Sequence, residues 1–121
     1  MRQALALTIA QLRRDYPDAS YNNVIETADF TFATQAHADK PKYSAGLRRI
    51  YEEAGWSRRI DSYYELGYMT IPHADGSVTS VASSSGFAAS DHWNKLGNDT
   101  LLVISHRDAS VQELSLSERP R

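Results

Sequence analysis

The sequence changes its pattern at Gly67, and this change constrains the fold more than any other feature. Before Gly67, apolar residues recur mostly at intervals of three and four, which is the spacing of helices that bury one face. After Gly67, short β-branched and apolar runs are separated by turn residues, as in strands. Helices followed by strands predict an α+β fold, in which N-terminal helices pack on a small, mostly antiparallel sheet of about four strands.

The chain is long enough for one hydrophobic core and too short for two. Its 121 residues predict a single domain over 1–121, mainly helical over 3–67 and mainly β over 68–116. One short helix is expected near 89–96, and a frayed tail at 117–121. Hydrophobic residues make up 41% of the chain and charged residues 23%, which argues against global disorder.

The chain has no cysteine, which excludes disulfides, thiolate metal sites and cysteine nucleophiles. The first ten residues form a mostly apolar run that superficially resembles a signal peptide. However, Thr8 and Gln11 break the run, and no small-residue cleavage site follows it. No stretch approaches the ~18 apolar residues of a membrane span. We therefore expect a cytoplasmic protein that does not enter a membrane.

A first helix is predicted at about residues 3–15. Arg13 and Arg14 near its end complement the helix dipole, and Pro17 stops it. The apolar residues of this segment follow each other at steps of four, three and four, and so share one face: Leu5, Ile9, Leu12 and Tyr16.

Residues 22–38 fit two patterns. Residues 30–34 alternate aromatic and β-branched side chains, as in a strand. Apolar residues nevertheless recur at helical spacing through the segment, and no turn residue interrupts 24–38. We predict a helix here, with a strand as the alternative.

Two further helices are predicted on either side of Gly55. Ser44 is a candidate N-cap for the first, and Gly55 ends it. Ser57 is a candidate N-cap for the second, which Gly67 closes. The inward positions of these helices and of the later strands predict the buried core: Leu5, Ile9, Leu12, Leu47, Ile50, Ile60, Val103 and Ile104.

The β part begins with a predicted hairpin. Strands at 68–71 and 78–81 flank Asp75-Gly76, a strong hairpin signal. Pro72 places the first strand at an edge, or ends it. Residues 100–104 are apolar on both faces and predict a covered central strand, and a last strand is expected near 111–116.

One segment concentrates the residue types of binding surfaces. Six of the thirteen Lys and Arg residues, five of the seven Tyr and one of the two Trp lie between residues 40 and 68. Trp, Tyr and Arg are enriched at interface hot spots. A solvated helix face is the plainer interpretation, since Arg48 and Arg49 precede Glu52 and Glu53 by four residues. The candidate binding residues are Arg48, Arg49, Trp56, Arg58 and Arg59.

Three of the four histidines occur in the pattern His-x-Asp, which could supply metal ligands or a general base with its orienting acid. The plainer interpretation is that each Asp belongs to a turn. A metal-dependent or His-based hydrolase is therefore an alternative, and no metal or cofactor is expected. If such a site exists, two hairpin tips of one sheet would bring together its candidate catalytic residues: His73, Asp75, His106 and Asp108.

A nucleic-acid-binding regulator is the second alternative. Two short helices around a turn over 47–67 have the outline of a helix-turn-helix motif. Against this, Asp61 and Glu65 would face a polyanion, and the chain carries a net charge of −2.

These patterns predict a small non-catalytic interaction module, which acts as a regulator or inhibitor by docking on a larger macromolecule. A protein is the expected partner, and nucleic acid is possible through the local basic patch. A compact chain of this kind would suit a phage- or plasmid-encoded inhibitor of a host system.

Overall fold

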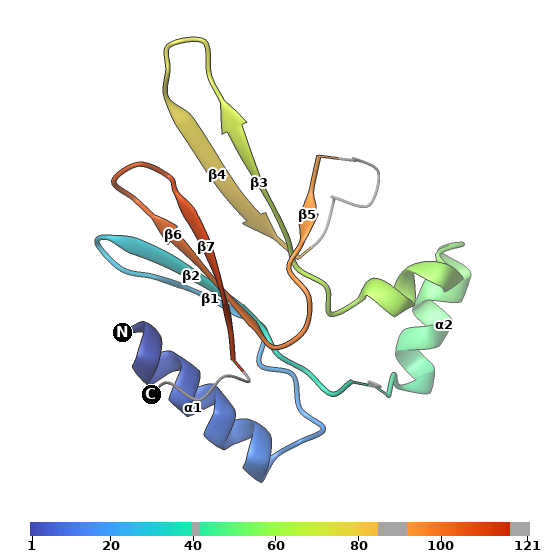
Figure 1. Ribbon diagram of the computed structural model, residues 1–121. Coiled ribbons are helices and arrows are strands. Elements are labelled where there is room, and N and C mark those ends of the chain that lie inside the picture. Colours follow the sequence, from blue (N-terminus) through green and yellow to red (C-terminus); the bar gives the residue numbers. More distant parts are fainter. Residues whose placement is uncertain (40–41, 85–91, 117–121) are drawn as a thin grey trace.

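The computed structural model describes residues 1–39, 42–84 and 92–116, and it has the α+β architecture that the sequence predicts (Figure 1). A four-stranded antiparallel sheet has the order β1-β2-β6-β7, and a second, three-stranded sheet has the order β4-β3-β5. The elements are α1 (Arg2–Asp15), β1 (Asn23–Glu26), β2 (Phe30–Gln35), α2 (Ala45–Glu53), the 3₁₀ helix η1 (Ser57–Ser62), β3 (Gly67–Pro72), β4 (Val78–Ser83), β5 (Asn94–Lys95), β6 (Thr100–Ser105) and β7 (Val111–Ser115).

The four-stranded sheet lies between α1 and the second sheet. On one face, Leu5 of α1 packs against a buried cluster of Phe32, Leu101 and Val103. The other face carries the larger core cluster, to which the second sheet and its flanks contribute. That cluster contains Ala33, Leu66, Leu96, Leu102 and Ile104, with Tyr68, Ala82 and Val111 packed against it.

Strand β6 is the internal strand that lines both cores. Leu101 and Val103 project to the α1 side, and Leu102 and Ile104 project to the side of the second sheet. All four are buried. The prediction of a covered central strand at 100–104 is confirmed, because a strand that alternates between two cores must be apolar on both faces.

The helix predicted at 22–38 is wrong, because β1 and β2 form an antiparallel hairpin there. The turn between them is made by Thr27, whose hydroxyl accepts a hydrogen bond from the Phe30 N–H at 3.1 Å. Its backbone N–H in turn donates to the Phe30 carbonyl at 2.8 Å. The apolar residues have helical spacing, but the segment forms a strand because β2 pairs with β6, which is about 70 residues away in the chain.

The predicted hairpin at 68–81 is confirmed, with Pro72 opposite Val78 at its closed end. Gly76 has φ +86°, which glycine adopts without strain. Strand β5 pairs only with Gly67 and Tyr68, so Pro72 lies beyond that pairing, as a residue without a backbone N–H requires. Ser80 of β4 donates to the Ala109 carbonyl at 2.6 Å and ties the hairpin to the β6–β7 turn.

Two other predicted helices differ from the structure. Residues 94–95 of the helix expected near 89–96 form β5, while 89–91 lie outside the described residues, as does the tail at 117–121. Ser57 does not cap a helix. Trp56 holds the N-cap position of η1, and the structure gives it no side-chain capping bond.

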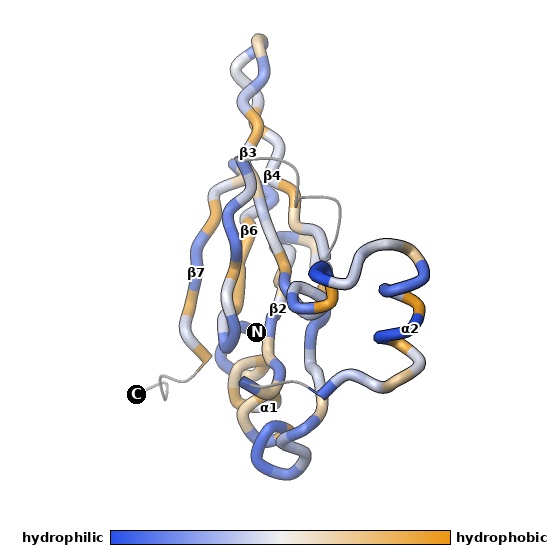
Figure 2. The backbone as a smooth tube through the Cα atoms, turned by 90° about the vertical axis from the view of Figure 1, so that its right-hand side faces the viewer, coloured by the Kyte–Doolittle hydropathy of each residue, from blue (hydrophilic) through white to orange (hydrophobic). Residues whose placement is uncertain are grey.

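The predicted core is partly correct. Ile9, Ile60, Val103 and Ile104 are buried. Leu5, Leu12 and Leu47 are half-buried. Ile50 is 62% exposed, so its predicted burial is wrong. The reason is visible in Figure 2, where α2 stands beside the strands and covers neither face of a sheet. The apolar face of α2 packs on η1, which reaches only part of it.

Candidate functional site

The candidate binding residues lie on one unit, the α2–η1 lobe, which we define as residues 44–65. Ser44 caps α2 by accepting a hydrogen bond from the Leu47 N–H at 3.1 Å. Gly55, with φ +74°, ends the helix and turns the chain into Trp56 and η1. These two local signals, a capping serine and a left-handed glycine, place α2 and η1 side by side.

A cluster of aromatic rings holds the lobe together. Tyr51 of α2 packs edge-on against Trp56 and Tyr63, with ring centroids 6.4 and 6.2 Å apart. Tyr63 in turn meets Tyr64 edge-on at 4.9 Å and Tyr43 at 6.1 Å. Edge-to-face contacts of this kind favour one defined arrangement of the rings. The lobe is therefore shaped by aromatic contacts.

The lobe leaves three large apolar side chains in solvent: Ile50 is 62% exposed, Trp56 49% and Tyr63 44%. Trp56 thus does two things at once, since one edge packs on Tyr51 while half of its surface stays open. The guanidinium of Arg59 lies over its ring, 5.3 Å from the centroid. This cation–π contact holds an exposed indole and an exposed charge in one place.

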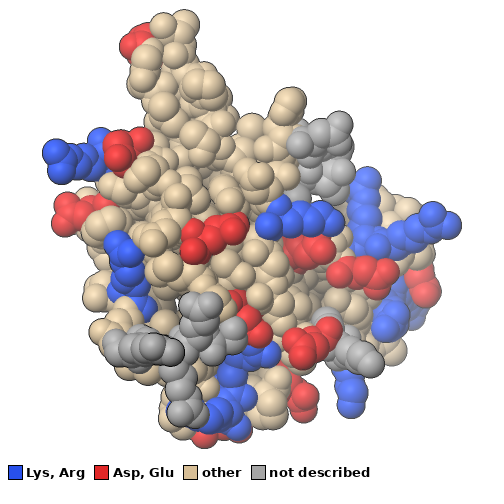
Figure 3. Space-filling view, in the orientation of Figure 1, with Lys and Arg blue, Asp and Glu red and all other residues tan. Residues whose placement is uncertain are grey.

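The five predicted binding residues are all exposed and all lie on this lobe: Arg48, Arg49, Trp56, Arg58 and Arg59. Figure 3 shows Lys and Arg side chains gathered over the lobe with acidic side chains between them. The lobe carries four Arg and four acidic residues, so its formal charge is balanced. Arg49 is paired with Glu53 at 2.8 Å.

The helix-turn-helix outline is not formed in this lobe. Its second helix is η1, a 3₁₀ helix of six residues, in place of an α-helix long enough to enter a major groove. Asp61 lies on this short helix and is exposed. The lobe therefore lacks both the shape and the charge excess of that motif.

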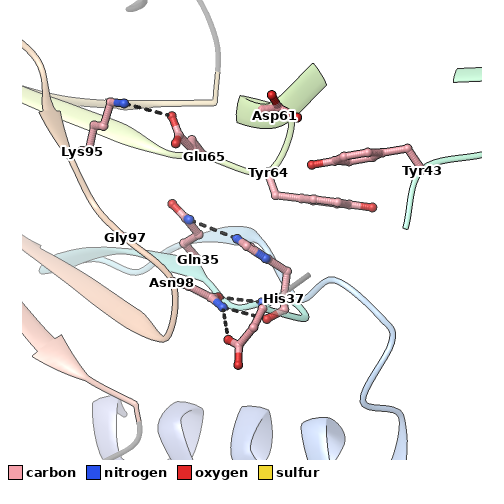
Figure 4. A pocket seen from close by; sticks show the side chains of 10 residues that line it. Gln35, His37, Tyr43, Asp61, Tyr64, Glu65, Lys95, Gly97 and Asn98 are labelled. Carbon is pink, nitrogen blue, oxygen red and sulfur yellow. Dashed lines mark hydrogen bonds and ion pairs between the residues drawn. The ribbon is translucent and has the colours of Figure 1, made fainter. Parts of the chain in front are cut away.

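A pocket of about 380 Å³ opens beside the lobe, where η1 and the start of β3 approach the end of β2 (Figure 4). One wall is a stack of three rings, in which Tyr64 lies between His37 and Tyr43. The ring centroids are 5.2 and 5.8 Å apart. The lining residues are Gln35, His37, Asp39, Tyr43, Asp61, Tyr64, Glu65, Lys95, Gly97 and Asn98.

The floor of the pocket is a network of hydrogen bonds around His37. Nδ1 of His37 lies 2.8 Å from the Ala38 carbonyl, which a protonated Nδ1 satisfies. Nε2 lies 3.2 Å from the amide nitrogen of Gln35, so it accepts. The amide oxygen of Gln35 accepts from the buried Leu66 N–H at 2.8 Å, which fixes the direction of the Gln35 amide. The ring is thus held in one orientation and one tautomer.

Asn98 ties this floor to the turn before β6. Its amide oxygen accepts from the His37 N–H at 2.9 Å, and its amide nitrogen donates to the His37 carbonyl at 2.8 Å. The same nitrogen lies 3.3 Å from Asp39. Arg13 of α1 also donates to the His37 carbonyl and forms an ion pair with Asp99. Residues far apart in the chain therefore fix this part of the pocket.

Burial and the negative charge around the pocket both raise the pKa of Tyr43. Burial raises the pKa of the Tyr43 hydroxyl above its ordinary value, and the carboxylate of Asp61 raises the pKa further. Tyr64 and Glu65 act in the same direction, while Arg48, over the ring at 5.6 Å, opposes them. The phenol is thus kept protonated and can act as a hydrogen-bond donor or acceptor in the pocket.

The His-x-Asp pairs end in three different places. His37 and Asp39 line the pocket. His73 lies on the β3–β4 turn, with Nε2 2.7 Å from the Thr79 hydroxyl. His106 follows β6, with Nε2 2.7 Å from the Thr31 hydroxyl and Nδ1 3.1 Å from the Ala28 carbonyl.

Asp75 and Asp108 have the turn roles that the plainer interpretation predicted. Asp75 accepts from the hydroxyl and the backbone of Ser77, and Asp108 accepts from the hydroxyl and the backbone of Ser110. These bonds lower the pKa of both carboxyl groups. Within 1–39, 42–84 and 92–116, no three His, Asp or Glu side chains are grouped so as to hold a metal ion.

No single sequence pattern predicts all the residues that line the pocket. The excess of aromatic residues at 40–68 included Tyr43 and Tyr64, and the His-x-Asp pattern included His37 and Asp39. Gln35 and Asn98 carried no signal, since Gln35 lies in the segment predicted as a helix. Only the pairing of β2 with β6 brings them together.

Comparisons with known proteins found no matching family model, no matching curated protein and no matching solved structure. No helix among the described residues is long and apolar enough to cross a membrane.

Proposed function

We propose that this protein is a small non-catalytic interaction module that docks on a larger protein through its α2–η1 lobe and acts there as a regulator or inhibitor. The observation that carries this proposal is the exposure of Ile50, Trp56 and Tyr63 on one lobe, at 62%, 49% and 44%. Large apolar side chains gathered on a small unit rimmed by charges are typical of interaction sites.

The arrangement of Trp56 supports a docking role. Trp and Arg are the residue types most enriched at interface hot spots. Arg59 lies over the indole and Tyr51 packs against its edge, so part of the entropy of ordering Trp56 is already lost in the free protein. Binding through an ordered side chain loses less entropy than binding through a mobile one.

The charge of the lobe favours a protein over a nucleic acid. Phosphate backbones are bound by an excess of Lys and Arg. Here Glu52, Glu53 and Asp61 stand among the arginines, and the lobe is neutral as a whole. A protein surface with an apolar centre and a rim of both charges would complement it.

The proposal is tested by affinity capture of the partner from the source cells, followed by binding measurements on purified proteins. Trp56→Ala and Ile50→Ser should each weaken the complex by at least ~2 kcal/mol, which is roughly 30-fold. Val24→Ser is the matched control, because Val24 is 60% exposed on β1, outside the lobe. It should bind like the wild type.

Each variant is first checked for its thermal midpoint and near-ultraviolet circular dichroism. If Trp56→Ala unfolds, Ile50→Ser still tests the proposal, since the exposed side chain of Ile50 contributes little to the core. Wild-type affinity in folded lobe variants, or an equal loss in Val24→Ser, would show that the partner binds elsewhere.

A further inference from the structure

We propose that the pocket beside the α2–η1 lobe binds a small organic amine, with its ammonium group at the carboxylates of Asp61 and Glu65 and its apolar body along the ring stack of His37, Tyr64 and Tyr43. This inference goes beyond the proposed docking function and does not depend on it. The docking surface is made by Ile50, Trp56, Tyr63 and the arginines, and none of these lines the pocket, whose lobe residues are Asp61, Tyr64 and Glu65.

The size of the pocket suits a small molecule. Its volume of about 380 Å³ lies within the usual range of ligand sites. Such sites combine an apolar or aromatic wall with a few polar groups that converge on the ligand. Here Tyr64 and its two stacked neighbours form the wall, and the lining also includes Asp61 of η1 and Glu65 from the chain before β3. Figure 4 shows the Glu65 carboxylate turned toward Lys95 at the rim of the pocket.

The walls are also largely fixed before any ligand arrives. Both hydrogen-bonding ends of Gln35 are engaged, one by Leu66 and the other by His37. The backbone carbonyl of Tyr64 accepts a hydrogen bond from Asn22 at 2.6 Å, which anchors the middle of the ring stack. A fixed pocket avoids the entropy cost of ordering its walls on binding.

The polar groups that remain are mainly acceptors. Three carboxylates line the pocket, from Asp39, Asp61 and Glu65, against one cation, Lys95. The amide nitrogens of Gln35 and Asn98 both already donate within the floor, to His37 Nε2 and to the His37 carbonyl. Among the described side chains, none donates a hydrogen bond to Asp61. A ligand with hydrogen-bond donors and a positive charge, such as an ammonium group, would therefore complement this lining.

The raised pKa of Tyr43 agrees with this reading of the charge. After burial, the largest contribution comes from the Asp61 carboxylate, and Glu65 adds to it. The negative potential of both side chains thus reaches the ring stack, in the space where the ammonium group would bind.

The ammonium group of Lys95 would compete with the amine ligand for the carboxylate of Glu65. Its ammonium lies 3.7 Å from Glu65, while its side chain is 72% exposed. An exposed pair of this length is weak, so an incoming amine can displace it. The pair shows that an ammonium group reaches Glu65 from the rim of the pocket.

The proposal is tested by titrating phenethylamine into the protein and following the NMR signals of Tyr43, Tyr64 and Asn98. Phenethyl alcohol is the neutral analogue, and hydrocinnamate is the anionic one. Saturable binding of the amine is expected, with both analogues at least roughly ten-fold weaker, because each lacks the charged donor.

Four variants locate the amine. Glu65→Gln and Asp61→Asn keep the shape and remove one charge each, and each should weaken binding roughly ten-fold. Lys95→Ala should tighten binding by about three-fold, since it removes a weak internal competitor. Arg107→Ala removes a charge from the distant β6–β7 turn and should change nothing. Trp56→Ala should also bind the amine normally, which separates this test from that of the docking surface.

Three results would overturn the proposal: no saturable binding of phenethylamine, equal binding of the neutral alcohol, or unchanged affinity in both carboxylate variants. Asp61 is exposed on η1, so Asp61→Asn is expected to fold even if Glu65→Gln does not. A gain of affinity in Lys95→Ala, opposite in sign to the losses, cannot come from general destabilisation of the pocket.

Discussion

At the scale of single residues, the cross-strand pair Asn23 and Thr34 carries the buried polar atoms without a partner that are found among the described residues. The two residues face each other between β1 and β2. Within the described residues, the buried Oδ1 of Asn23 and the buried Oγ1 of Thr34 have no hydrogen-bond partner. Thr34 is fully buried on the α1 side of the sheet, beside Leu101. A buried hydroxyl without a partner lowers stability relative to an apolar group of the same size.

Thr34→Val should therefore leave the free energy of unfolding unchanged or raise it by about 1 kcal/mol, since it removes the hydroxyl and keeps the volume. The adjacent Gln35→Leu should have the opposite effect and cost about 1–3 kcal/mol, because Gln35 bonds both Leu66 and His37. Urea denaturation of both variants measures the difference. A Thr34→Val protein that loses more than about 1 kcal/mol would mean that the hydroxyl has a partner after all.

At this scale the sequence predicts exposure better than partnership. Trp56 could be placed on the surface because it lies at the junction of two predicted helices, and the four arginines because they lie away from the apolar positions of those helices. The partners of Gln35 and Asn98 could not be predicted, since hydrogen bonds across 31 and 61 residues depend on a sheet that local spacing does not encode.

At the scale of elements, the two hairpins show which strands can be predicted from the sequence. The β3–β4 hairpin carries Asp75-Gly76, a turn that specifies itself locally. The β1–β2 hairpin turns on Thr27, whose side-chain and backbone bonds to Phe30 give no comparable signal. The prediction of a helix over β1 and β2 therefore followed the spacing of the apolar residues, whereas the observed strands are stabilised by the pairing of β2 with β6.

The Asp75 turn makes a prediction that depends on pH. Hydrogen bonds from Ser77 hold the pKa of Asp75 below its ordinary value of 3.8, so Ser77→Ala should raise that pKa toward the ordinary value. A depressed folded pKa contributes stability above the ordinary value, and this stability is lost as the pH falls through the folded pKa. Carboxyl ¹³C shifts measured against pH report the titration.

Ser110→Ala is the matched control, since Ser110 bonds Asp108 in the same way in the β6–β7 turn. It should raise the pKa of Asp108 and leave Asp75 unchanged. Identical titration of Asp75 with and without the Ser77 hydroxyl would show that this hydroxyl does not bond Asp75 in solution.

At the scale of the whole molecule, the protein has two parts of unequal burial. Of the eleven buried apolar residues among those described, seven lie in α1 and the sheets. Three more lie directly beside a strand: Ala36, Leu66 and Leu96. The α2 helix contains no buried residue, and Ile60 is the lobe's only buried residue among those described. The α+β class follows from the change of pattern at Gly67, but the order of helices and strands does not, because β1 and β2 precede α2. The position of the lobe beside the sheets does not follow from it either, because the apolar stripe of α2 looks the same whether it meets a sheet or a 3₁₀ helix.

Native-state hydrogen exchange should separate these two parts. The backbone amides of α2, such as those of Arg48 and Ala54, should exchange through local opening at a lower free energy than those of β2 and β6. In the same experiment Val103→Ala should cost about 2–5 kcal/mol in global stability, and Ile50→Ala less than about 1 kcal/mol. Equal protection of α2 and β6 would mean that the lobe unfolds only with the core.

Strand β1 forms one edge of the four-stranded sheet and exposes Val24 and Ile25. The outer side of such a strand offers unpaired N–H and C=O groups to any extended chain that approaches it. Its four residues are few, and Glu26 adds a charge beside the turn. Concentrated protein should therefore be prone to slow strand-to-strand association at this edge, and a lysine on the outer face of β1 is the change that natural edge strands use against it.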